Sequence, residues 1–176
     1  MSNPAFDNET ALGTVEGKIH DIVNKMGGDI EYRFHNWAQL NVEMDKITKP
    51  TIVYVLPPSG NIYIDGYVQE IKDYPEAQIA FLCSTEFDFE SDENDALVES
   101  MKRLCYRFIK ALNDSGYFSQ LVGKIPYQIL YDHLDDNVTG VVITPKLEEE
   151  VGVSLCIIDS EEPAERPEEE TPEDNE

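Results

Sequence analysis

The stretch that decides the fold is residues 85–116, "TEFDFESDENDALVESMKRLCYRFIKALNDSG", which passes from a run of carboxylates to a run of helix-forming residues. Its apolar residues recur at i, i+4, i+7, i+8, i+11 and i+15, the spacing of one helical face. They are Leu97, Met101, Leu104, Cys105, Phe108 and Leu112. The pattern predicts an amphipathic helix of about six turns, closed by a C-cap near Gly116.

The acidic opening of this stretch could be a metal site or the start of the helix. The carboxylates concerned are Glu86, Asp88, Glu90, Asp92 and Asp95. A calcium loop requires a glycine at its sharp turn, and this stretch has none. Ser91 or Asp92 can instead cap exposed helix N–H groups, and the helix dipole favours negative charge in the first turn. We therefore expect a helix start and no metal site.

Strand signals precede the helix. Residues 51–71, "TIVYVLPPSGNIYIDGYVQEI", hold two runs rich in β-branched and aromatic residues, joined by a Pro-Pro-Ser-Gly turn that is typical of a hairpin. The first run is nearly all apolar and predicts a buried central strand. Gly66 in the second run suggests a bulge. Residues 77–89 predict a third strand, introduced by a turn at Tyr74-Pro75.

Further helices and strands are expected before residue 51 and after residue 116. Ile19, Ile22, Val23 and Met26 predict a short N-terminal helix that ends at Gly27-Gly28, whereas residues 32–47 fit a strand and a helix equally well. After the long helix, residues 125–131 alternate and are expected to pair with 138–144. Residues 153–158 would then close the sheet.

Together these elements predict an α+β protein. We expect a mixed, largely antiparallel sheet of about six strands, with the long helix and the shorter N-terminal helix packed on it. Residues 1–158 are expected to form one globular domain with a flexible N-terminus over 1–11. Residues 159–176, "DSEEPAERPEEETPEDNE", hold ten acidic residues, one Arg and three Pro, and predict an acidic disordered tail.

The charge of the chain limits its partners. The net charge is −23, of which −9 lies on residues 159–176 and −14 on residues 1–158. Binding to nucleic-acid phosphate requires many Lys and Arg, so a surface that grips DNA is not expected. A partner held by charge should be basic.

Cysteines and apolar runs indicate the compartment. Cys83, Cys105 and Cys156 are odd in number and lie in apolar segments, which predicts buried free thiols in a reducing environment. The N-terminal residues do not resemble a secretory signal, and no apolar run approaches the roughly 20 residues that span a bilayer. We expect a protein of the cytosol with no membrane contact.

Signals of catalysis are weak. His20, His35 and His133 have no recognisable triad partners, and no nucleophile elbow or phosphate-binding glycine loop is present. Asp65 with Glu70-Ile71-Lys72 imitates the D…E-x-K pattern of magnesium-dependent nucleases, but an acidic body would repel DNA. The sequence therefore predicts no enzyme, no catalytic residues and no cofactor.

Aromatic residues exceed what one core face needs. They include Trp37, Tyr54, Tyr63, Tyr67, Phe87 and Phe89. Either most of them are core residues, or some face other subunits. Trp37, Phe87 and Phe89 are the candidate subunit-interface residues.

Four stretches carry a resemblance to a known group. In order, they are "NVEMDKITKPTIVYVLPPSG", "IAFLCSTEFDFESDENDALVESMKRL", "FIKALNDSGYF" and "YQILYDHLDDNVTGVVI", within residues 41–143. This succession resembles the head–tail connector and tail-terminator (tail-completion) proteins of tailed bacteriophages. It also resembles predicted proteins of phages and prophages of gut Bacteroidales, including the crAss-like group.

The resemblance implies a structural virion protein that forms a ring at the portal–tail junction, assembled in the cytoplasm of the bacterial host. Neighbouring portal, connector or tail-tube proteins would be its partners, and DNA would pass through without specific binding. An acidic channel wall repels phosphate, so the candidate channel-lining or partner-facing residues are acidic. They are Asp88, Glu90, Asp92, Glu148, Glu149 and Glu150. The alternative is an acidic adaptor or DNA-mimic inhibitor that binds a basic protein.

Overall fold

The computed structural model describes residues 13–39, 47–67, 69–84, 91–130 and 138–154, with the side chains of residues 91–94 left aside. Two helices and eight strands lie in these ranges. In chain order they are α2 (Val15–Met26), β1 (Glu31–His35), β2 (Thr51–Val55), β3 (Gly60–Asp65), β4 (Glu70–Pro75), β5 (Gln78–Ser84), α4 (Ser91–Ser115), β6 (Tyr127–Leu130), β7 (Val138–Ile143) and β8 (Val153–Ser154). The predicted α+β class is confirmed.

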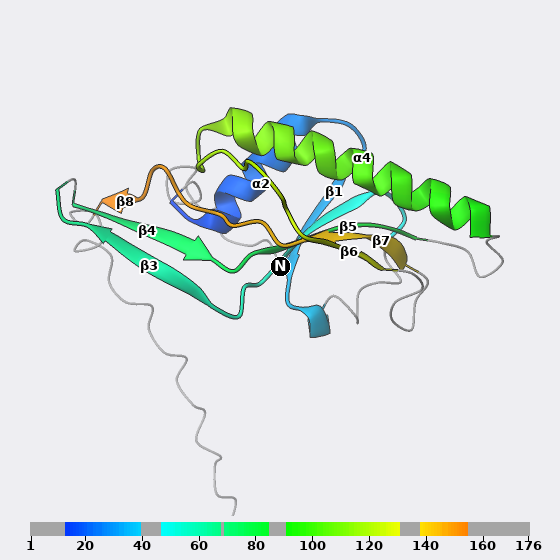
Figure 1. The fold of residues 1–176 in the computed structure, drawn as a ribbon, viewed down its shortest axis with the longest axis horizontal. Helices are drawn as coiled ribbons and strands as arrows, with labels where there is room; N and C mark the ends of the chain where they lie inside the picture. Colours follow the sequence, from blue (N-terminus) through cyan, green and yellow to red (C-terminus); the bar gives the residue numbers. More distant parts are fainter. Residues whose placement is uncertain (1–12, 40–46, 68, 85–90, 131–137, 155–176) are drawn as a thin grey trace, which may run out of the picture.

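The strands form two sheets. The larger has the order β1-β2-β5-β7-β6, in which β1 and β2 are parallel and every other neighbouring pair is antiparallel. The smaller has the order β3-β4-β8 and is antiparallel. Both helices cover the same face of the larger sheet, while the smaller sheet extends beyond them as an arm (Figure 1). We call β3, β4 and β8 the arm.

The long helix is the main cover of the core, as its periodicity predicts. Five of the six residues of its predicted apolar face are buried: Met101, Leu104, Cys105, Phe108 and Leu112. Phe108 meets Phe81 of β5 edge to face, with ring centroids 5.6 Å apart. Burial raises the pKa of the Cys105 thiol to about 12, so this cysteine is a neutral core residue. Cys83 is also a free thiol, and Cys156 lies outside the described residues.

The predicted N-terminal helix is also confirmed. Thr14 caps it, with the Gly17 backbone N–H donating to the Thr14 hydroxyl oxygen at 3.0 Å. Gly27 ends it with φ +62°, a conformation that favours glycine. Ile19, Ile22 and Val23 are buried against the sheet and α4.

The opposite face of the larger sheet has a second buried cluster. It consists of Ile47, Val53, Val55, Ala80, Leu82, Val138 and Val142. Strand β2 is therefore buried on both faces, which confirms the prediction of a central strand at 51–55. A strand covered on both sides must be apolar along its whole length, as this one is.

The predicted hairpin between residues 51–56 and the following run is wrong. Strand β2 pairs with β1 and β5, whereas β3 pairs with β4. Pro57 and Pro58 cannot donate ladder hydrogen bonds and hold the chain extended, so the chain leaves the sheet there. The expected bulge at Gly66 is wrong as well, whereas the expected turn before β5 is present, with the Ala77 backbone N–H donating to the Pro75 backbone oxygen at 2.9 Å. The tight turn lies between Asp65 and Glu70, and Tyr74-Pro75 end β4.

The last strand differs from expectation. Residues 153–154 do not close the larger sheet but pair with β4 in the arm. The undecided segment begins with strand β1 and continues with helical residues at 37–39. By contrast, the expected pairing of β6 with β7 is confirmed, with Tyr127 opposite Ile143.

A substitution at Gly140 tests the packing of the central strands. A Cβ atom at this position would lie 2.0 Å from the backbone oxygen of Phe81 on β5. Because backbone cannot yield to such a contact, we expect Gly140→Ala to lower the free energy of unfolding by about 3 kcal/mol or more. Urea denaturation followed by circular dichroism measures the change.

Gly66→Ala is the matched control, since a Cβ at Gly66 meets nothing within 4 Å. Its expected effect is within about 0.5 kcal/mol. Equal stability of the two variants would contradict the described register of β5 and β7.

Candidate subunit interface

The arm exposes apolar side chains on one face. Ile62 and Ile64 of β3 lie on the same face of the arm. Ile71 of β4 pairs with Ile64 on one side and with Val153 of β8 on the other, so it lies on this face too. Ile62 is 74% exposed and Ile64 is 61% exposed. Such side chains on a strand at the edge of a sheet favour contact with another chain.

The turn at the end of the arm is fixed by local hydrogen bonds. The Asp65 carboxylate accepts from the Tyr67 backbone N–H at 2.9 Å, and the Asp65 backbone oxygen accepts from the Gln69 N–H at 2.9 Å. Gln69 has φ +57°, which a turn of this kind requires. Tyr67 is fully exposed at the turn. These hydrogen bonds hold the described residues of the turn, with the Tyr67 ring exposed.

The other face of the arm carries polar and aromatic residues. Tyr63 of β3 stacks on Tyr74 of β4, with ring centroids 6.0 Å apart. Asp65 lies opposite Glu70, and Lys72 lies on the same face two residues further along β4. The two faces therefore differ in chemistry, and the apolar one is the candidate for contact with a second chain.

The register brings the nuclease-like residues onto one face of the hairpin. Both carboxylates, however, are engaged within the chain: Asp65 holds the turn, and Glu70 accepts from the Gly152 N–H at 3.4 Å. Within the described residues, no three Asp, Glu, His or Cys side chains come together as a metal site requires.

A buried ion pair attaches the arm to the body. Lys18 of α2 and Glu149 lie 2.6 Å apart, and the side chains of both are nearly inaccessible to solvent. Lys18 also donates to the backbone oxygen of Val151 at 2.6 Å, and the second oxygen of Glu149 accepts from the Asp73 backbone N–H at 2.6 Å. Three separate segments therefore meet at one pair: α2, strand β4 and the approach to β8. We call this arrangement the latch.

A groove lies at the base of the arm. Its volume is about 430 Å³, and it is lined mainly by apolar residues with acidic residues at its edge. Phe34 and Tyr54 stack in it, with ring centroids 5.4 Å apart, and Leu56 is exposed beside them. Glu16 and Asp73 supply the acidic edge. The groove adjoins the apolar face of the arm, because Ile62 of β3 lines it as well, and none of the described residues of the turn is among its lining residues.

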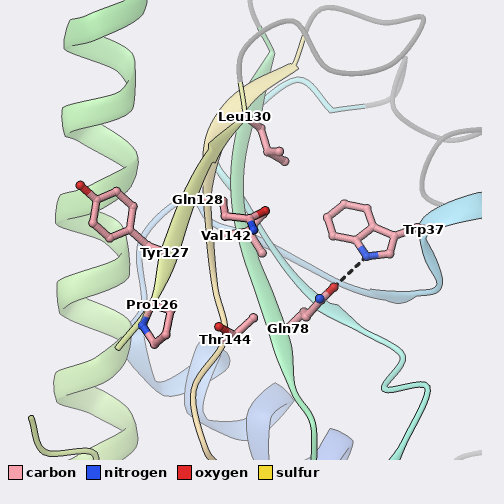
Figure 2. Close-up of a pocket in the computed structure, with 8 residues that line it drawn as sticks. All are labelled: Trp37, Gln78, Pro126, Tyr127, Gln128, Leu130, Val142 and Thr144. Atoms are coloured by element: carbon pink, nitrogen blue, oxygen red, sulfur yellow. Dashed lines mark hydrogen bonds between the residues drawn. The ribbon is translucent and has the colours of Figure 1, made fainter. Parts of the chain in front are cut away.

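Trp37, a predicted interface residue, lies elsewhere. It borders a hollow of about 400 Å³ on the sheet face opposite the helices, and its indole N–H donates to the Gln78 side-chain oxygen at 2.8 Å (Figure 2). The remaining lining residues are Pro126, Tyr127, Gln128, Leu130, Val142 and Thr144. No charged side chain is among these lining residues. Trp37 is 36% exposed, so part of the ring is accessible to a partner.

The structure separates the other predicted site residues. Phe87, Phe89, Asp88 and Glu90 lie outside the described residues, and Asp92 is in the first turn of α4. Glu148 and Glu150 are exposed, and Glu150 accepts from the Ser119 hydroxyl at 2.6 Å. Glu149 is only 4% exposed, so its carboxylate does not face a channel or partner in this conformation. The expected acidic cluster at 148–150 is thus two surface charges and one buried member of the latch.

No model of a known protein family matches the chain, and no curated protein matches it significantly. The helices that the structure describes are too short or too polar to cross a membrane.

Removal of the latch cation should destabilise the protein. Lys18→Met leaves Glu149 buried without its cation, and we expect a loss of about 3–5 kcal/mol in the free energy of unfolding. Urea denaturation measures it. Lys25→Met on the same helix is the matched control, because the Lys25–Asp21 pair is exposed and should contribute far less. Similar losses in both variants would contradict the role of the latch.

Asp73 provides a pH-dependent test of the same region. Burial, together with the nearby Glu149 carboxylate, raises the pKa of Asp73 above its ordinary value of 3.8. The ionised Asp73 carboxylate therefore lowers the free energy of unfolding at pH 7. This destabilisation is lost as the pH falls from the raised pKa of the folded state to below the ordinary value of 3.8.

We accordingly expect Asp73→Asn to raise the melting temperature at pH 7 and to leave it unchanged near pH 3. Thermal denaturation across this range provides the measurement. A gain that is independent of pH would show that the carboxylate charge is not the cause.

Proposed function

We propose that the chain is a structural virion protein that forms a ring at the phage head–tail junction, as a connector or tail-terminator subunit. In this role it continues the DNA channel and performs no catalysis. The observation that carries the proposal is the apolar face of the arm, which is exposed at Ile62 and Ile64 although the body already has a complete helix-covered core. A soluble monomer has no use for such a surface, whereas an assembly does.

The arm has the reach that an assembly contact needs. Its paired strands are six residues long, so it extends roughly 20 Å along the strand direction. The latch fixes its base, which lowers the conformational entropy lost when the arm binds. A rigid projecting element can contact a neighbouring subunit while the two bodies remain apart.

The arm and the groove favour a ring over a symmetric dimer. The turn with Tyr67 and the groove with Phe34 and Leu56 are different surfaces of one chain. When the turn of one subunit's arm enters the groove of the next, the contact is head to tail, and its repetition gives a ring where the rotation between neighbouring subunits closes. The groove is largely apolar and can accept the exposed ring of Tyr67.

The charge supports a channel role. A net charge of −23 repels DNA phosphate, so DNA can slide past the ring without being held. Glu148 and Glu150 are surface carboxylates available to such a wall. In the virion, the ring would contact the portal, another connector or the tail tube, after assembly in the host cytoplasm.

Light scattering on the purified chain and on Ile62→Asn/Ile64→Asn tests the arm contact. The wild type should have the mass of a ring, and the variant the mass of a monomer. Loss of two buried isoleucines weakens each contact by about 3–6 kcal/mol, or roughly 10²- to 10⁴-fold. Val122→Asn is the matched control: Val122 is 81% exposed but lies off the arm, so the ring should persist. Equal masses for the wild type and the arm variant would contradict the arm contact.

Electron microscopy of phage particles with an antibody against the chain tests the location. Label at the neck between head and tail is the expected result. A chain that is monomeric in solution and absent from particles would refute the virion role. Salt-dependent binding of that monomer to basic proteins would then support the acidic adaptor.

A further inference from the structure

Residues 100–113 of α4 carry the opposite charge to the rest of the chain. Residues 100–113 contain four basic residues and no acidic ones, although the whole chain has 13 Lys and Arg against 36 Asp and Glu. Arg103, Arg107 and Lys110 follow one another at i, i+4 and i+7, and all three are exposed. We call these three residues the basic stripe. The exposed ring of Tyr106 lies next to it in the sequence.

The basic stripe is incompletely neutralised. Lys110 pairs with Asp114, whereas Arg103 and Arg107 form no ion pair within the part of the chain that the structure describes. Lys102 is engaged by Glu99 at 2.7 Å and lies over the Tyr127 ring. Like charges four residues apart on a helix repel each other, so the two arginines favour a nearby anion. A carboxylate is a suitable anion, because it can accept two parallel hydrogen bonds from one guanidinium.

The chain itself carries the complementary charge. Residues 159–176 contain ten Asp or Glu and a single Arg, and they form its longest acidic stretch. We propose that this acidic segment binds the basic stripe of its own chain. The proposal depends on the charges of α4 and of the C-terminal residues, and it holds whether or not the chain forms a ring.

The acidic segment is long enough to reach the stripe. The last described residue, Ser154, lies three residues after Val151, which is hydrogen-bonded to Lys18. From Lys18 through the end of α2 to Gly28, the chain advances about 15 Å. A Cβ atom at Gly28 would lie 4.0 Å from the Arg107 guanidinium. The path from Ser154 to the Arg107 guanidinium is therefore roughly 40 Å long, side chains included. The 14 residues from Ser154 to Glu168 span about 46–50 Å when extended, which exceeds this distance.

The covalent connection favours the chain's own segment over that of a neighbour. A tethered segment that can span the distance has an effective concentration of about millimolar, which exceeds the micromolar concentration of free chains in a typical experiment. Single exposed ion pairs are weak, so several carboxylates must act together with the arginines. Binding of this kind is strongly weakened by salt.

Carbodiimide cross-linking of the full-length chain tests the proposal, because it joins carboxylates to lysines only where they are in contact. The acceptors are Lys110, which belongs to the stripe, and Lys102, which precedes Arg103 in the sequence. At about 20 mM salt we expect mass spectrometry to find cross-links from residues 159–176 to these lysines, and at about 500 mM salt at least roughly fivefold fewer. Mixing isotope-labelled with unlabelled chains separates cross-links within a chain from those between chains.

Arg103→Gln/Arg107→Gln is the test variant, since it keeps both lysine acceptors. It should reduce the cross-links by about fivefold or more. Lys124→Gln/Lys146→Gln changes the net charge equally, at exposed positions off the stripe, and should leave them unchanged. Cross-links spread evenly over all exposed lysines, an equal loss in both variants, or a majority between labelled and unlabelled chains would each overturn the proposal.

Discussion

The buried contact between Lys18 and Glu149 is the interaction on which the arrangement of the arm depends. Removing two charges from water is costly, and the cost is offset only where each charge has close partners. Here Lys18 has a carboxylate and a backbone oxygen, and Glu149 has an ammonium and a backbone N–H. These requirements are met in one geometry, so the pair specifies how α2, β4 and the approach to β8 fit together. Apolar contacts alone would restrict that orientation less.

The close approach of Gly152 adds a steric constraint at the same place. A Cβ there would lie 2.3 Å from the backbone oxygen of Ile71, so the segment after the latch passes directly against β4. Electrostatic pairing and backbone contact thus act on adjacent residues. The arm is a hairpin of two six-residue strands joined by a third strand of only two residues, and a hairpin alone is marginally stable. Its attachment to the body supplies the stability that its own small size cannot.

The elements that the sequence predicts well are those whose signal is local. The i, i+4, i+7 pattern of α4 and the continuous apolar run of β2 each reflect burial against the core. The sequence pattern does not predict the arm, because residues 60–71 fit one strand with a bulge at Gly66. Asp65-Gly66 between two apolar runs is itself a hairpin signal, and it predicts the turn that the structure has there. Glu149 could not have been found in this way, since its cation lies 131 residues away and three successive glutamates resemble a solvated loop.

The order of the larger sheet has a consequence for how this protein can vary. Because β2 and β5 are direct antiparallel neighbours, the β3–β4 hairpin of the arm is inserted into the connection between two strands of one continuous ladder. Lengthening or shortening β3 and β4 together at their turn changes neither the register of that ladder nor the packing of the helices. The reach of the arm and the stability of the core are therefore separable, and selection can adjust one without altering the other.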